Sequence, residues 1–192
     1  MINSMERFSL VKIGSSISRD VLGLVSPKPV VLVTCVDESG KPNIITIAAV
    51  TGASHEPPMF VIAVRHDRYS HKLIDKSKEY VINVPTITHV EQVIFCGQKS
   101  GREVDKFKET KFTPIPAEVV KVPLIAECPI NIECKVVAAV KPGTHTLFVG
   151  QVLTVHVEEG MFDGTKLNLQ LLPALTWNTL EYLKPGKIIR RT

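Results

Sequence analysis

Six runs of apolar, largely β-branched residues, separated by turn-forming residues, dominate this chain of 192 residues. The runs are Val30–Val36, Ile44–Thr51, Met59–Val64, Glu79–Pro85, Ile130–Val140 and Thr144–Glu159. Val, Ile and Thr favour extended backbone because their branched side chains fit a pleated sheet. Several of the runs also alternate apolar and polar residues, as half-buried strands do. We therefore expect an antiparallel barrel rather than a fold of alternating strands and helices.

Helices are expected to be few and short. The segment Tyr69–Lys78 has apolar residues at the spacing of an amphipathic helix, and Asp67 or Ser70 could serve as its N-cap. Two weaker helix candidates are Ser18–Val25 and Thr88–Phe95.

Glycine and proline predict the irregular parts of the chain. The segment Gly52–Pro58 is expected to be a loop, and the polar segment 96–110 a mobile loop with one helical turn. Gly150 lies in the middle of the last long strand, where a β-bulge or a barrel corner is expected.

Composition favours one domain over 1–192, with an N-terminal extension at 1–21, a barrel core at 22–160 and a C-terminal segment at 161–192. The formal net charge is only +4, and four basic residues crowd the last nine positions. The tail alone can account for this excess. We therefore expect no chain-wide nucleic-acid surface.

The cysteines and the apolar segments indicate the compartment. The four cysteines, Cys35, Cys96, Cys128 and Cys134, are scattered and include no C-x-x-C pair, so buried free thiols are expected. The first residues lack the apolar segment of a signal peptide, and no apolar run reaches membrane-spanning length. We expect a cytoplasmic protein with no membrane partner.

The usual enzyme motifs are absent. The chain has no G-x-G-x-x-G after a strand, no phosphate-binding P-loop, no H-E-x-x-H and no G-x-S-x-G. His55 precedes Glu56, but the two following prolines prevent the helix that would align a second ligand. No metal site is predicted.

The stretch "RHDRYSHK", Arg65–Lys72, is the most unusual local feature because it follows an apolar strand directly. A strand that passes into a helix near Ser70 points free backbone N–H groups at the space before the helix, where anions bind. Arg65, with Lys72 or Arg68, would add charge, and the geometry suits a phosphate monoester. The alternatives are a solvated helix end and, less well supported, a nucleic-acid patch.

The order of several segments resembles the flavin reductase-like, FMN-binding split-barrel family. The matching segments are "SPKPVVLVTCVDESGKPNIITIAAVTGASHEPPMFVIAVRHDRYSHKLI", "SKEYVINVP", "SGREVDKF", "PLIAECPINIECKV" and "GTHTLFVGQV". Together they span roughly Leu22 to Glu158. The resemblance implies an antiparallel, Greek-key split β-barrel with a few short helices.

The resemblance also implies FMN held at a homodimer interface. The cofactor-binding residues that it implies are Asn43, Thr46, Ile47, Ala48, Ala49, Gly52, Ser54, Arg65, Tyr69, Ser70 and Lys72. Among these, Thr46 and the backbone at Ile47 and Ala48 would bond the flavin ring. The segment Gly52–Ser54 would approach the ribityl or phosphate region. The residues matched to the phosphate end are Arg65, Tyr69, Ser70 and Lys72.

His145 is the one candidate for a catalytic side chain, by resemblance to the family's Gly-Asp-His motif. Here that motif reads Gly143, Thr144 and His145. Many flavoredoxin-like members also carry an aromatic residue where this chain has Val50, so stacking beside the flavin is expected to be reduced.

Three functions follow as hypotheses. The first is an oxidoreductase that transfers hydride from NAD(P)H to FMN and onward to free flavin, a ferric chelate or a redox protein. The second is a flavoredoxin-type electron carrier that keeps its FMN and reacts poorly with NAD(P)H. The third, a nucleic-acid-binding barrel, predicts strongly salt-dependent affinity.

Overall fold

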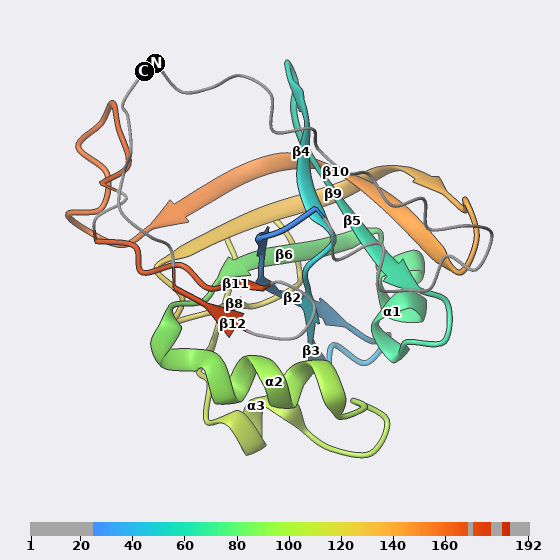
Figure 1. The fold of residues 1–192 in the computed structure, drawn as a ribbon. Helices are drawn as coiled ribbons and strands as arrows, with labels where there is room; N and C mark the ends of the chain where they lie inside the picture. The colour runs from blue at the N-terminus through green and yellow to red at the C-terminus, as the bar shows by residue number, and fades with distance from the viewer. Residues whose placement is uncertain (1–24, 169–170, 178–181, 185–192) are drawn as a thin grey trace, which may run out of the picture.

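The computed structural model describes residues 25–168, 171–177 and 182–184 (Figure 1). Its centre is a seven-stranded antiparallel sheet with the strand order β3-β2-β6-β9-β10-β5-β4. The strands are β2 (Val31–Val36), β3 (Pro42–Ile47), β4 (Val50–His55), β5 (Pro58–Arg65), β6 (Glu79–Val84), β9 (Ile130–Val140) and β10 (His145–Val157). This confirms the predicted mainly β fold. The helix expected at Ser18–Val25 and most of the basic tail lie outside the described residues.

The chain passes directly from one edge of this sheet to the other. Strand β3 is one edge and pairs with β2, whereas β4 is the opposite edge and pairs with β5. Only Ala48 and Ala49 separate β3 from β4, and the Ala63 N–H of β5 donates to the Ala49 carbonyl at 2.9 Å. The crossing folds the sheet into a barrel that is split along the line between its two edge strands.

Two expectations are corrected at this crossing. The segment Ile44–Thr51 is not one strand, because the chain changes edges after Ile47. The predicted loop Gly52–Pro58 is mostly strand, with the turn confined to Glu56 and Pro57. The edge strand β4 has one neighbour and so tolerates Gly52, and Pro58 is the first residue of β5, a position that proline can occupy. The sequence pattern by itself does not reveal that β4 is an edge.

Two large apolar cores flank the sheet, and a smaller cluster joins Val36 and Val81 to Val120, Val122 and Leu124. One fills the barrel with side chains from β2, β5, β6, β9 and β10, including Tyr80 and Phe148. The other lies between the sheet and two helices on one side of the molecule, α2 (Val90–Gln98) and α3 (Lys106–Thr110) (Figure 1). All four cysteines are buried and free, as expected.

The helices agree only partly with the sequence pattern. A 3-10 turn (Ile87–His89) leads into α2, which continues through residues 96–98 of the predicted loop. The expected helical turn is α3, which is capped by the Asp105 side chain accepting from the Lys108 N–H at 3.2 Å. No helix in the described part of the chain is long and apolar enough to cross a membrane.

The helix α1 (Tyr69–Ser77) confirms the helix expected over Tyr69–Lys78, but neither Asp67 nor Ser70 is its N-cap. Its N-cap is Arg68, and no side chain caps it. Ser70 lies inside the first turn, where it is buried and accepts a hydrogen bond from the Asn43 side-chain amide at 2.8 Å. The His71 N–H donates to the Arg68 carbonyl at 3.0 Å, so the N–H groups that remain open at the start of α1 are those of Tyr69 and Ser70.

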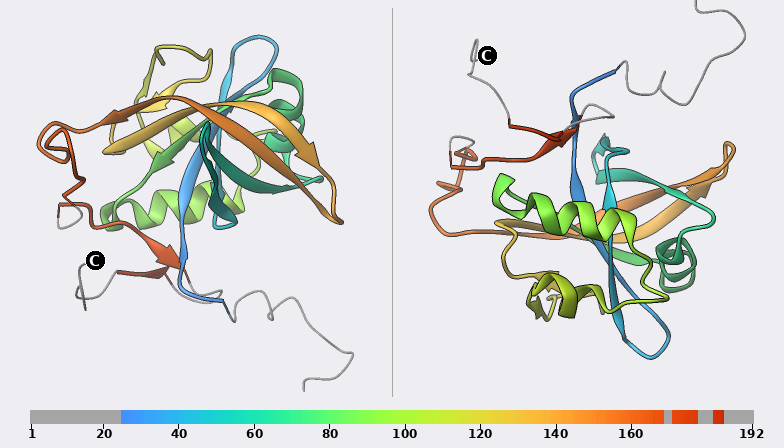
Figure 2. Two further views of the ribbon diagram at one scale, coloured as in Figure 1. Left: turned by 90° about the horizontal axis from the view of Figure 1, so that it is seen from above. Right: turned by 60° about the horizontal axis from the view of Figure 1, so that its bottom comes forward.

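Short strands complete the fold. β7 (Pro114–Ile115) pairs with β8 (Leu124–Ile125), and β1 (Lys28–Pro29) pairs with β11 (Thr176–Trp177), which pairs in turn with β12 (Tyr182–Leu183). The β11–β12 hairpin therefore lies against the start of β2, above α2 (Figures 1 and 2). Residues far apart in sequence meet here.

Gly150 confirms the expected irregularity, since the β9–β10 register shifts between Val149 and Gly150. A Cβ atom at Gly150 would lie 2.1 Å from the Tyr80 hydroxyl. Tyr80 is fully buried, and its hydroxyl donates to the Phe60 carbonyl at 3.4 Å. The absence of a side chain at Gly150 is therefore what admits the tyrosine to the barrel core.

We predict that Gly150→Ala lowers the free energy of unfolding by about 1–3 kcal/mol, because the core must shift to admit the methyl group. Urea denaturation measures this. Gly52→Ala is the matched control, since a Cβ there meets nothing within 4 Å; it should change stability by at most about 0.5 kcal/mol. Equal effects of the two substitutions would contradict the packing argument.

Candidate functional site

A pocket of about 670 Å³ lies at the split, and we call it the split pocket. Its lining comes from β3 and the crossing, from β5, β10 and α2, and from the C-terminal hairpin. The residues are Val30, Ile45, Thr46, Ile47, Ala48, Ala49, Ala63, Arg65, Arg68, Ile94, Gly97, Gln98, His145, Trp177 and Tyr182. This volume is typical of sites for small organic ligands.

A smaller hollow of about 210 Å³, which we call the end chamber, adjoins the split pocket. The two share Ile45, Arg68 and Gly97 in their linings. The end chamber is lined by Asn43, Ile45, Asp67, Arg68, Tyr69, Ser70, Cys96, Gly97, Lys99, Ser100, Gly101, Arg102, Glu103 and Lys106. The combined space runs from the crossing to the first turn of α1.

Nine of the twelve expected site residues line this combined space. Thr46, Ile47, Ala48, Ala49, Arg65 and His145 line the split pocket, and Asn43, Tyr69 and Ser70 line the end chamber. The fold thus brings together residues that lie more than a hundred positions apart in the sequence.

The split pocket follows the free edge of β3. In an antiparallel ladder, alternate residues of an edge strand turn their backbone groups away from the partner strand. The Ile44 carbonyl is turned outward, because it accepts a hydrogen bond from Lys106 Nζ at 2.7 Å. By the same alternation the backbone groups of Thr46 face outward. The pocket therefore offers backbone donors and acceptors to the edge of a flat ring.

The Thr46 side chain also makes a contact within the protein. Its hydroxyl donates to the Val93 carbonyl of α2 at 2.5 Å. The hydroxyl proton is therefore used to fasten β3 to α2, and only lone pairs remain for a ligand. Gly97 permits this close approach, since a Cβ there would lie 3.4 Å from Thr46 Cβ.

Lys106 is a buried cation between the end chamber and the protein core. It is 3% exposed, and its Nζ donates to the Ile44 and Cys96 carbonyls at 2.7 Å each. Burial lowers the pKa of this amine. An ammonium group has three donors, so one remains after these two bonds. Lys106 thus joins α3 to β3 and α2 and brings positive charge to the chamber wall.

Asn43 leaves a hydrogen-bonding position open beside the same chamber. Its side chain is 4% exposed, and Oδ1 is buried with no partner among the described residues. The two ends of an amide are exchanged by a half-turn of the group. After that turn Oδ1 would accept from the Ser70 hydroxyl, and the amide N–H₂ would be the open position. The site can therefore supply a donor to an anion.

Further cations surround the first turn of α1. Arg68 precedes the helix and lines both hollows. Arg102 lies 5.4 Å from the centre of the Tyr69 ring and donates to the Asp67 carbonyl at 3.4 Å, so segment 99–106 is held against α1. Free N–H groups at a helix start, with cations beside them, form an anion-binding site.

Arg65 and His145 both line the split pocket, where they are cross-strand partners on β5 and β10. Arg65 forms an exposed ion pair with Asp67 at 2.6 Å. Burial, and then the charge of Arg65, lower the pKa of His145, which favours its neutral form. His145 Nδ1 lies 2.9 Å from the Thr144 hydroxyl, so its Nε2 is the ring nitrogen left for a ligand.

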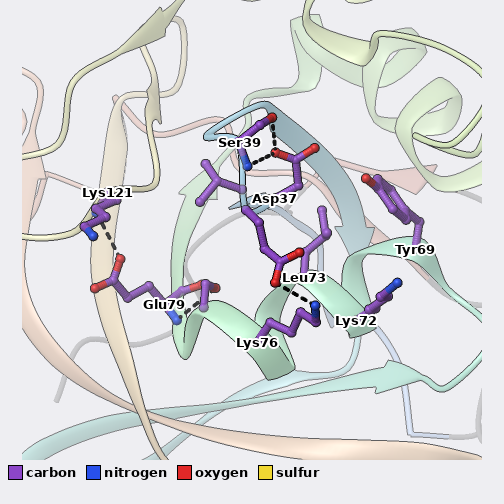
Figure 3. Close-up of a pocket in the computed structure, with 11 residues that line it drawn as sticks. Asp37, Ser39, Tyr69, Lys72, Leu73, Lys76, Glu79 and Lys121 are labelled. Carbon is purple, nitrogen blue, oxygen red and sulfur yellow. Dashed lines mark hydrogen bonds and ion pairs between the residues drawn. The ribbon is translucent and has the colours of Figure 1, made fainter.

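Three expected residues lie outside the combined space. Lys72 lines a different hollow on the other side of α1, together with Lys76 and Asp37 (Figure 3). Gly52 and Ser54 lie on β4 and line a third hollow with His55. Within one chain these residues do not meet the rest of the predicted site. Val50 does not line the pocket either, because it packs against the barrel core.

Sequence reasoning missed two parts of the lining. Segment 97–106 was interpreted as a mobile loop, although its "SGREVDKF" motif was a usable signal. Trp177 and Tyr182 gave no periodic signal, since they lie in two-residue strands. Among the described residues no group of His, Cys, Asp or Glu is arranged to hold a metal ion.

Comparisons with known proteins agree with this geometry. The model of the flavin reductase like domain matches residues 24–182. A protein of Pyrococcus abyssi is 39% identical over 71% of this chain and 79% of its own length. The reductase component of an FADH(2)-dependent resorcinol hydroxylase from Rhizobium is 29% identical over 67% of this chain and 70% of its own.

Solved structures give the same result. A flavoredoxin from Methanosarcina acetivorans superimposes with a TM-score of 0.84 at 25% identity, over 95% of each chain. The family model covers far more than half of the sequence, and the curated and solved relatives span most of it. The chain belongs to the flavin reductase-like family.

Proposed function

We propose that this protein binds FMN in the split pocket and end chamber and is an oxidoreductase that takes hydride from NAD(P)H. The observation that carries the proposal is the continuity of the two hollows. A flat-ring pocket along the open edge of β3 leads into a small cationic chamber at the start of α1. FMN has the same two parts, a planar heterocycle and a phosphate.

The end chamber suits a phosphate monoester. The groups available there are the first N–H groups of α1, the Arg68 and Lys106 cations, and the open position of the Asn43 amide. A dianion gains most from donors that are already fixed, because little ordering is needed on binding. Lys106 and Asn43 are fixed by burial, and Arg102 by its contacts with α1 and Asp67.

The split pocket suits the ring. Alanines at positions 48, 49 and 63 leave a smooth surface beside the edge of β3. The outward backbone groups of Thr46 complement a ring edge that carries both a donor and acceptors. When bound, FMN supplies the capacity to accept two electrons as hydride. The role of the protein is to hold the ring, exclude water from one face and place Arg65 and His145 beside the reacting region.

An electron carrier of the flavoredoxin kind is the second candidate. It is favoured by the similarity to the Methanosarcina acetivorans flavoredoxin, whereas the resorcinol hydroxylase reductase component favours the enzyme. Both candidates use the same site. They differ in whether a nicotinamide nucleotide reaches the ring and in whether the acceptor is a protein, free flavin or a ferric chelate.

We also propose a homodimer in which the partner subunit completes the site. The long β9–β10 hairpin carries large apolar side chains on the surface, with Val137, Val140 and Val155 about half exposed. Gly52 and Ser54, which stand apart from the site in one chain, lie on the β4 edge, where a partner subunit could bring them into contact with its flavin.

The first test is the visible absorption spectrum of the purified protein, recorded after FMN is added and the excess removed. We expect a flavin spectrum that bleaches within seconds when NADH or NADPH is added without oxygen. A spectrum that persists with both nucleotides but bleaches with dithionite would favour the electron carrier. No retained flavin would contradict the proposal.

The phosphate position is tested by Gly101→Ala. A Cβ there would lie 2.0 Å from Asn43 Oδ1 and 3.1 Å from the Tyr69 ring, so it would push apart two walls of the end chamber. We expect the Kd for FMN to rise about tenfold or more (about 1.4 kcal/mol), while the Kd for riboflavin, which lacks the phosphate, changes little. Flavin fluorescence measures both.

Gly143→Ala is the control for this experiment, because a Cβ there meets nothing within 4 Å. It should leave both flavin affinities unchanged. If Gly101→Ala weakens the binding of riboflavin as strongly as the binding of FMN, the phosphate does not occupy the end chamber.

The oligomeric state is tested by light scattering during gel filtration. We expect twice the chain mass of 21.2 kDa. Val140→Lys should shift the protein toward one chain and weaken FMN binding, because a charge would be placed in the apolar interface. Val119→Lys, at a position 56% exposed on another part of the surface, is the control and should do neither. A wild-type monomer that binds FMN would overturn this proposal.

A further inference from the structure

The C-terminal hairpin β11–β12 supplies an aromatic wall to the split pocket. Trp177 and Tyr182 face each other across the hairpin, and both line the pocket. Neither was expected from the sequence pattern or from the family resemblance. Their position is set by the tertiary structure, because the hairpin reaches the pocket by pairing with β1.

The wall is anchored to the core. Trp177 is the register partner of Lys28 on β1, and the Val30 N–H donates to the Leu175 carbonyl at 3.2 Å. Within the hairpin, the Thr176 hydroxyl donates to the Leu183 carbonyl at 3.1 Å. Both aromatic side chains are partly buried against the core that lies between the sheet and α2. They form a fixed surface rather than a loose cover.

The same pocket has a second chemical feature besides this wall. Arg65 and His145 approach it from the ends of β5 and β10. The Arg65–Asp67 pair is about half exposed, and such pairs contribute little. A guanidinium has five N–H donors, so Arg65 can bind a second carboxylate or phosphate in addition to Asp67.

We propose that the split pocket contains a second ring site that selects flat aromatic acids. An aromatic ring lies against Trp177 and Tyr182, and its carboxylate or phosphate is bound by Arg65 and His145. This inference rests on the proposed function in one respect: FMN takes the edge of β3 and the end chamber, and leaves the aromatic wall to the second molecule. Trp177 and Tyr182 are then the residues that determine specificity.

Physical chemistry supports a flat ring over a saturated one. Aromatic pairs gain about 0.5–1.5 kcal/mol beyond the burial of their surface, through stacked or edge-to-face contact. A saturated ring of the same size buries similar area without this gain. The anionic group adds charge-assisted hydrogen bonds to Arg65, which a neutral amide cannot replace.

The test compares three ligands of similar size on the FMN-loaded protein. Benzoate has the flat ring and the charge, cyclohexanecarboxylate lacks the flat ring, and benzamide lacks the charge. Binding is followed by the change in flavin absorption and by tryptophan fluorescence. Trp177 is the only tryptophan in the chain, so its fluorescence reports on this wall alone.

We expect benzoate to bind at least fivefold more tightly than either of the other ligands. Trp177→Leu should remove most of the preference for benzoate over cyclohexanecarboxylate, while the Kd for FMN changes less than threefold. Trp177→Phe retains an aromatic ring and should therefore keep the preference for benzoate over cyclohexanecarboxylate. That result would also show that the hairpin still folds when Trp177 is replaced. Arg65→Gln should remove the preference for benzoate over benzamide.

Two results would overturn the inference. One is equal binding of benzoate and cyclohexanecarboxylate by the wild-type protein. The other is a loss of FMN affinity in Trp177→Leu as large as the loss of benzoate affinity, because the hairpin would then hold the flavin itself. If the protein binds no FMN, the proposed function fails. In that case the ring site is tested in the flavin-free protein, by measuring how strongly each of the three ligands quenches the fluorescence of Trp177. Stronger binding of benzoate than of the other two ligands would support the ring site.

Discussion

The site depends on one topological constraint: the chain passes from one edge of the sheet to the other over Ala48 and Ala49. This step leaves the edge of β3 unpaired, and unpaired backbone groups need partners. Lys106 satisfies part of that edge by donating to the Ile44 carbonyl, and the Thr46 hydroxyl fastens the strand to α2. The rest faces the split pocket. The same step brings β5, and with it Arg65, beside β3. The pocket is therefore a consequence of how the barrel is closed.

The cations beside this space are held in two different ways. Lys106, in the wall of the end chamber, is buried and held by two carbonyls, so its position hardly varies. Arg65, in the wall of the split pocket, is exposed and shares an ion pair with Asp67. A buried, preorganised cation suits a cofactor that stays bound, whereas an exposed guanidinium suits a molecule that arrives and leaves. The aromatic hairpin lies on the side of the pocket where that exchange is proposed.

The sequence predicted much of the fold and part of the site. β-branched runs identified β2, β5, β6, β9 and β10, because those strands are buried and their composition reports burial. The division between β3 and β4 was missed, since residues 44–51 are uniformly apolar or small and nothing local marks a change of edge. Lys72 was included because it shares a cationic stretch with Arg65. Arg65 ends β5, whereas Lys72 lies on α1 and lines a different hollow, and a linear pattern near a helix start does not resolve that difference.

What the sequence determined by itself is the family, the mainly β architecture and the cationic strand-to-helix turn, because each of these is written in local residue types and their order. Only the tertiary structure decided which cations converge and which aromatic side chains line the pocket. Lys106 reaches the chamber through α3. Trp177 reaches the pocket by pairing with β1, where its register partner Lys28 lies 149 positions earlier in the chain. Such contacts form only when long loops close. They are stabilised by apolar surface that is buried only when segments distant in the sequence come together.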